Sequence, residues 1–358
     1  MRRPAVPPRV VLHAQGGSRG TLRCTSIRLK FQVPPRPLRP GAAFAGRLRR
    51  LAWRLAGLIL AFGLTACAAT QTERLLEQPG GLPPRAEIAE VPFFPQERYY
   101  CGPAALAMVL AWSGLPVTAE DLVPQVYTPG REGSLRSDIL GGTRRNGRLA
   151  VEVGRLDALL AELAAGHPVL VFQNLGLDLL PQWHFAVAVG YDLTAGTIIL
   201  RSGTEARREL PLGTFERTWR RGDFWALTVL APDRLPVTAG QRDVVEAAAG
   251  LERVGRLSEA ETAYATALGR WPESHAAVMG LGNTRYAADD ASGAEAAYRR
   301  AIELRPDSPS AWNNLAYALK ALGRRSEAVS AAQRAVALGG AQTTRYQDSL
   351  QEIMDGEP

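Results

Sequence analysis

The first 66 residues contain no aspartate and no glutamate. They hold 13 of the 42 basic residues of the chain, which leaves 29 basic residues against all 35 acidic ones, a net charge of −6 for the remainder. The overall charge of +7 therefore reflects a leader segment of the kind that is removed from a mature chain. This distribution excludes the high isoelectric point as an argument for nucleic-acid binding, and no nucleic-acid partner is expected.

Long hydrophobic runs are also scarce. The apolar run Leu55–Leu64 is ten residues long, too short to span a bilayer comfortably. Four arginines precede it between residues 47 and 54, and the small residues Thr65 and Ala66 follow it. A basic region, an apolar core and small residues before a cleavage site predict a secretory signal peptide at 47–67.

The end of that signal, Leu64-Thr65-Ala66-Cys67, resembles the lipobox of bacterial lipoproteins. The resemblance implies that Cys67 is lipidated and becomes the new N-terminus; an ordinary cleavage site with a chance cysteine is the alternative. It further implies a membrane partner through the lipid anchor and a lipoprotein facing the periplasm. Ala68 after the cysteine favours sorting to the outer membrane.

The segments on either side of this signal lack the periodicity of a folded core. Residues 1–46 are rich in Pro, Arg and Gly, which predicts either a disordered basic arm or an over-long start, with translation beginning near Leu48. No methionine lies between Met1 and Met108. Residues 68–90, with a Pro-Gly-rich stretch, are interpreted as a linker that tethers the domain to the membrane.

Cysteine is rare, and this rarity draws attention to one position. Cys24 falls in the leader and Cys67 at the predicted anchor, so Cys101 is the sole remaining thiol. An extended stretch ends at Cys101, and apolar spacing from Leu106 predicts a helix that starts there and has Pro103 in its first turn. A helix N-terminus stabilises a thiolate. The alternative is a buried structural cysteine.

Beyond this helix the pattern predicts helices packed on an antiparallel sheet. Helices are expected after Thr118, from Ser134 to about Gly147 and over 155–165, the last closed by Gly166. Strands are expected at residues 149–153, 169–172, 184–191, 197–200 and 225–230.

Histidine is equally rare, with four in the chain. His13 lies in the leader and His275 in a helical region, while His167 sits in a Gly-His-Pro turn. His184 opens an apolar strand after a polar loop, at the rim of the expected sheet. It is the preferred base for Cys101, with His167 as the fallback. A strand histidine without a catalytic role is the alternative.

Pro92, Gln96, the triplet Cys101-Gly102-Pro103 and the run 183–192 together resemble the C39-like cysteine peptidases, a bacteriocin-processing family with a papain-like fold. The resemblance covers residues 91–230. It implies a peptide or protein substrate, Cys101 as nucleophile, His184 as base and acid, and Gln96 as oxyanion donor beside the Cys101 N–H. A surface-loop glutamine is the alternative for Gln96.

One member of the family pattern is missing. Relatives carry an Asp on the strand after the histidine strand, whereas this chain has Arg201-Ser202-Gly203 there. Asp192 lies eight residues along the strand from His184, about 26 Å away. Ser202 or Asn174 remains as the group that orients the imidazole, without the electrostatic help of a carboxylate.

The C-terminal part contains a repeat. Ala263-Tyr264 recurs at Ala297-Tyr298 and Trp271-Pro272 at Arg305-Pro306, an offset of 34 residues. This period and these residue types resemble tetratricopeptide repeats. After a linker at 231–240, three helix pairs and a capping helix are expected over 241–354. Such repeats imply a groove for a protein partner, and a purely structural appendage is the alternative.

The predicted fold is thus an α+β papain-like domain followed by an all-α tetratricopeptide solenoid. The predicted function is that of a lipid-anchored cysteine peptidase that needs no cofactor and no metal, whose repeats recruit substrate or a partner. A catalytically decayed peptide-binding or assembly lipoprotein is the alternative, supported by the missing Asp. Transfer of the acyl group to an amine, through the same thioester, is a second one.

Overall fold

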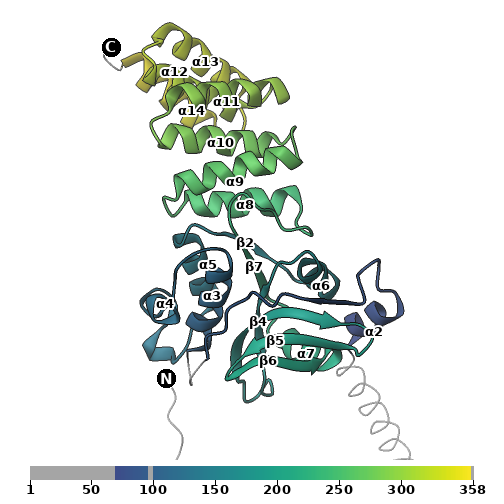
Figure 1. Ribbon diagram of the computed structural model, residues 1–358. Coiled ribbons are helices and arrows are strands. Elements are labelled where there is room, and N and C mark those ends of the chain that lie inside the picture. Colours follow the sequence, from purple (N-terminus) through teal and green to yellow (C-terminus); the bar gives the residue numbers. More distant parts are fainter. Residues whose placement is uncertain (1–68, 96–99, 356–358) are drawn as a thin grey trace, which may run out of the picture. The chain divides into compact units, whose positions relative to one another are not determined.

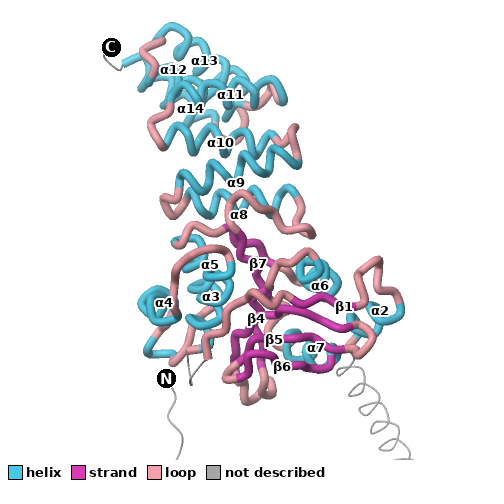
Figure 2. Tube along the Cα trace, viewed as in Figure 1, coloured by secondary structure: helices cyan, strands magenta, loops and turns pink. Residues whose placement is uncertain are grey.

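The computed structural model describes residues 69–95 and 100–355. Helices packed on an antiparallel sheet precede an all-helical region, so the predicted fold class is confirmed (Figures 1 and 2). The leader 1–46, the signal 47–67 with Cys67, and Gln96 lie outside the described residues. None of the helices within the described ranges has the length and apolar character needed to cross a membrane.

The sheet of the first domain is antiparallel throughout the described residues. Its order is β2-β7-β3-β4-β5-β6, and β1 also pairs with β4. The strands are β1 Arg85–Glu87, β2 Leu149–Glu152, β3 Val169–Asn174, β4 Trp183–Asp192, β5 Thr197–Ser202, β6 Glu205–Pro211 and β7 Ala226–Leu230.

Strand β4 is the centre of this domain. Its residues from Phe185 to Tyr191 are all buried, without alternation, and both α3 and α6 pack against it. A strand covered on both faces reads as a continuous apolar run. The strand pairing of β4 with β5 is irregular between Ala188 and Gly190.

The helices of this domain are α3 Cys101–Trp112, α4 Ala119–Val126, α5 Arg136–Arg145, α6 Leu156–Ala164 and α7 Leu212–Arg220. Helix α3 is buried along its whole length from Gly102 to Leu110, as expected for a helix that is apolar all round. Helix α4 starts as predicted, because Thr118 and Asp121 form a reciprocal capping box.

The interpretation of residues 68–90 as a free tether is wrong. Helix α2 (Thr70–Glu77) packs on α6 and α7, and the buried Glu216 carboxylate accepts the N–H groups of Gln71 and Thr72 at 3.0 and 2.7 Å. Strand β1 then pairs with β4. The Pro-Gly-rich stretch forms only the turn between these two elements, with positive φ at Gly80 and Gly81.

Strand β6 and helix α7 were not predicted from the sequence. The stretch Glu205–Pro211 is rich in charge and mostly exposed, because β6 pairs on one side only. An edge strand needs no apolar face, and charges on it hinder pairing with other chains. The strand signals used for the other strands were therefore missing.

The predicted linker 231–240 is fixed to the first domain by one buried carboxylate. Glu162, at the end of α6, is fully buried; it accepts the N–H and hydroxyl of Thr238 at 2.7 and 2.6 Å and contacts His167 Nδ1 at 2.7 Å. Burial alone would raise the pKa of Glu162, but the hydrogen bonds from His167 and Thr238 outweigh it and hold the pKa below its usual range.

The repeats form seven helices in the described residues. They are α8 Gln241–Glu252, α9 Leu257–Arg270, α10 His275–Ala287, α11 Ala291–Leu304, α12 Pro309–Ala321, α13 Arg325–Leu338 and α14 Thr343–Asp355. Tyr264 and Tyr298 fill the space beside Gly280 and Gly282, where an added Cβ would lie 2.3 and 2.5 Å from their rings. Both repeat tyrosines, one on α9 and one on α11, thus need glycine on α10, the helix between them.

The first repeat helix shares a core with the sheet. Leu149 and Val151 of β2 cluster with Val244, Ala248 and Leu251 of α8. Arg256 Nε also donates to the Arg145 carbonyl at 2.8 Å, at the end of α5. The repeats are therefore packed against the sheet domain at this point.

We expect Glu162→Gln to lower the free energy of unfolding by about 2–4 kcal/mol at neutral pH, because buried N–H groups lose a charged acceptor. A carboxylate with a depressed pKa stabilises the fold above its unfolded pKa, about 4.3, and less as pH falls further. The difference between wild type and variant should therefore shrink at pH 3 in urea unfolding. Equal destabilisation by the exposed control Glu205→Gln would contradict this.

Candidate functional site

Cys101 lies at the N-terminus of α3, half-buried beneath strand β4. Backbone N–H groups of Phe185, Gly102 and Cys101 itself are directed at its sulfur. Burial nevertheless raises the pKa of the Cys101 thiol, and these hydrogen bonds offset only part of that effect. The resting side chain is therefore a thiol, surrounded by donors that would stabilise the thiolate once it forms.

His184 is the second residue of β4 and directly precedes Phe185, whose N–H contacts the Cys101 sulfur. Burial, and secondarily the charge of Arg208, lower the pKa of His184 to about 4. The imidazole is therefore neutral at physiological pH. A neutral imidazole can accept a proton from a thiol.

Ser202, the last residue of β5, contacts the histidine. Its Oγ lies 2.9 Å from His184 Nε2, and the residue is buried. In the hairpin of β4 and β5, Val187 pairs with Arg201, the last pair of that ladder. Ser202 follows Arg201 and therefore lies toward the start of β4, where His184 is. Because Nε2 is engaged by the hydroxyl, Nδ1 is the ring nitrogen that this contact does not use.

Asn174 is used by the loop after β3. Its Oδ1 accepts the N–H groups of Gly176 and Gln182 at 3.0 and 2.8 Å, and its Nδ2 donates to the Leu177 carbonyl at 3.5 Å. Between the two candidates that the sequence left open, the structure brings Ser202, and not Asn174, to the imidazole. The other base candidate, His167, contacts Glu162 and the ring of Trp112. It therefore lies where Glu162 holds the linker 231–240, and not beside Cys101.

These groups share a cleft of about 1130 Å³. Cys101, His184 and Phe185 line it together with the loop residues Leu175 and Trp183. The ion pair between Arg136 and Asp223, 3.1 Å apart, lies on its wall. No local sequence signal pointed to this pair, because α5 and the turn after α7 meet only in the folded chain.

Ser134 is a cleft residue that the sequence analysis interpreted only as the start of a helix. A Cβ added to Gly102 would lie 2.2 Å from Ser134 Oγ, so the residue after Cys101 has room for glycine only. The Ser134 hydroxyl is buried and has no hydrogen-bond partner among the described residues. Gly102 thus lets this loop pack tightly against the start of α3.

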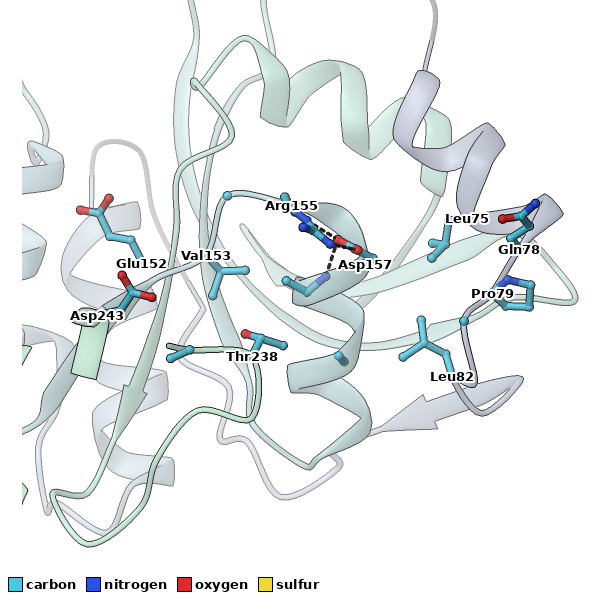
Figure 3. A pocket seen from close by; sticks show the side chains of 15 residues that line it. Leu75, Gln78, Pro79, Leu82, Glu152, Val153, Arg155, Asp157, Thr238 and Asp243 are labelled. Atoms are coloured by element: carbon cyan, nitrogen blue, oxygen red, sulfur yellow. Dashed lines mark hydrogen bonds and ion pairs between the residues drawn. The ribbon is translucent and has the colours of Figure 1, made fainter. Parts of the chain in front are cut away.

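A second pocket, of about 460 Å³, lies between α2, α6 and the linker (Figure 3). Leu75, Leu82 and Val153 give it an apolar part, and Arg155 forms an ion pair with Asp157 at its edge. Its described lining contains neither cysteine nor histidine. Cys101 and His184 lie in the larger cleft.

Residues 88–224 match the model of the Peptidase_C39 like family. A proposed C39-like peptidase from Bacillus anthracis, known from a crystal structure, is 18% identical over 41% of this chain and 97% of its own length, with a TM-score of 0.35. No curated protein matches the chain.

Residues 245–309 and 297–329 match tetratricopeptide repeat models. The type III secretion translocator chaperone SycD from Yersinia enterocolitica is 19% identical over 32% of this chain and 82% of its own, with a TM-score of 0.30. MamA is 18% identical over 33% and 68%, with a TM-score of 0.31. This chain therefore carries a C39-like peptidase domain followed by C-terminal tetratricopeptide repeats.

Proposed function

We propose that the chain is a lipid-anchored cysteine peptidase that hydrolyses a peptide bond through a thioester on Cys101. The observation that supports this most strongly is the cleft itself. It contains Cys101, whose sulfur meets the Phe185 N–H, and His184, whose Nε2 is held by Ser202. A nucleophile, a base and a group that orients the base are the elements of nucleophilic catalysis.

The proposed reaction starts from two neutral side chains. As the sulfur attacks the peptide carbonyl, the Cys101 proton passes to His184, which then gives it to the leaving amine. The thioester remains, and water then attacks its carbonyl while His184 accepts a proton from the water. The C–S bond breaks, the carboxylic acid product leaves, and the proton passes from His184 back to the Cys101 sulfur. The N–H groups at the start of α3 would stabilise the oxyanion, with Gln96 as a second donor.

The tetratricopeptide repeats would recruit the substrate or a partner protein. Their helix pairs continue from the sheet domain through the shared core of β2 and α8. A polypeptide held by the repeats would thereby have a raised local concentration at the peptidase domain.

A second candidate function is a peptide-binding or assembly lipoprotein without catalytic activity. It is favoured by the partner of His184, which is a hydroxyl and not a carboxylate, and by a pKa of about 4 for this histidine. A serine orients the ring but does little to stabilise the imidazolium that forms during attack.

We expect Ser202→Ala to lower kcat/KM by about 10–100-fold, because loss of one hydrogen bond to a buried group costs about 1–3 kcal/mol. Cys101→Ala should abolish cleavage of a fluorogenic peptide library. Thr228→Ala is the control, since Thr228 also donates from a buried strand position, to the Val151 carbonyl. Cleavage that persists in Cys101→Ala would rule out the proposed nucleophile.

The pH dependence separates a neutral pair from a thiolate–imidazolium pair. Because His184 has a lowered pKa, kcat/KM should rise as pH increases through about 4, where the imidazole becomes neutral. Because the thiol pKa is raised, alkylation of Cys101 by iodoacetamide should be slow at pH 7 and still increase above pH 9. Alkylation that is already maximal below pH 7 would demonstrate an ion pair instead.

The anchor is tested independently of catalysis. In a bacterial host, wild-type protein should incorporate labelled palmitate and sediment with membranes, because several acyl chains on Cys67 hold a protein stably. Cys67→Ser should lose the label and appear in the soluble fraction. Cys24→Ser is the matched control, and label that survives Cys67→Ser would refute lipidation at this residue.

A further inference from the structure

The loop between β3 and β4 exposes an unusual number of large apolar side chains. Its four leucines and Trp183, the first residue of β4, are here called the leucine rim. Their exposed fractions are Leu175 39%, Leu177 70%, Leu179 90%, Leu180 74% and Trp183 53%. Single exposed leucines are common, but a contiguous apolar group marks an interaction surface.

Hydrogen bonds hold the loop in one conformation, so the exposure of its leucines is part of the folded structure. Leu177 and Leu180 exchange backbone hydrogen bonds of 3.2 and 3.1 Å. Asn174 Oδ1 accepts two N–H groups of the loop, and the Arg221 guanidinium donates to the Asn174 carbonyl at 2.9 and 3.1 Å. The buried Asn174 amide and the Arg221 guanidinium thus fix a loop conformation in which the leucines face solvent.

The leucine rim continues into the cleft. Leu175 and Trp183 line the same cavity as Cys101 and His184, and Trp183 stacks on Phe172 with ring centroids 5.1 Å apart. Leu135, 40% exposed, also lines the cavity. A bound polypeptide that approaches Cys101 along this side of the cleft would therefore contact apolar side chains.

We propose that the leucine rim binds large apolar side chains of the peptide substrate beside the bond that Cys101 attacks. This inference rests on the proposed function and adds its substrate class: polypeptides with leucine-like residues near the cleavage site. Burial of rim and ligand side chains together would supply the affinity. The charges of the cleft balance, because Arg131 and Arg136 lie beside Glu132 and Asp223. With Asp178 in the loop, this surface has no excess of basic residues to attract an anionic bilayer, so a polypeptide is the occupant that the proposal favours.

The test measures binding without cleavage. Full-length protein with Cys67→Ser and Cys101→Ala is titrated against two fluorescein-labelled peptide pools, identical except that one has leucine where the other has serine. We expect at least tenfold tighter binding of the leucine pool by fluorescence anisotropy. Adding Leu177→Ser, Leu179→Ser and Leu180→Ser together should abolish this preference. Leu179→Ser alone should reduce it, and because this side chain is 90% exposed, the single substitution has little effect on folding.

A matched control carries three exposed substitutions elsewhere, Leu76→Ser, Val254→Ser and Leu322→Ser, whose side chains are 46%, 39% and 37% exposed. It should keep the preference. The proposal is overturned if both pools bind equally or not at all, or if the rim and control variants behave alike. It is also overturned if the rim substitutions abolish only binding to phosphatidylglycerol vesicles or only self-association. If the protein that keeps Cys101 cleaves no peptide, that result would count against the proposed function and not against the leucine rim.

Discussion

The packing of α3 against β4 decides where the candidate catalytic groups lie. This contact buries α3 from Gly102 to Leu110 and places the Cys101 sulfur at the Phe185 N–H, one residue from His184. The hairpin from β4 to β5 then supplies Ser202 to the imidazole. These groups lie at the ends of elements whose central residues are buried, so the packing of α3 on β4 sets their positions.

The same burial sets the chemical character of the site. Removing Cys101 and His184 from water disfavours the charged form of each, so the resting pair is a thiol and a neutral imidazole. A carboxylate beside the ring would shift this balance toward the ion pair, and the chain has a hydroxyl there. In the proposed reaction, electrostatic stabilisation would therefore come from the N–H groups at the start of α3, which would act on the charge that develops during attack.

The sequence predicts the helix of Cys101 and the strand of His184 because local apolar spacing and turn residues mark both elements. The choice between Ser202 and Asn174 could not be made in this way, since it depends on the irregular pairing of β4 with β5 and on loop hydrogen bonds that claim the Asn174 amide. The tether failed as a prediction for a similar reason. Its helix is held by Glu216, which lies more than a hundred residues away.

Helix α2 begins at Thr70, only three residues after Cys67. Three residues span at most about 11 Å. With acyl chains on Cys67, as proposed, the start of α2 would be held within that distance of the anchor, which would keep the folded domain at the bilayer surface. In the proposed lipid-anchored form, the domain would meet polypeptides at the membrane surface before those in the bulk of the compartment, so its location would itself select substrates before any side chain is recognised.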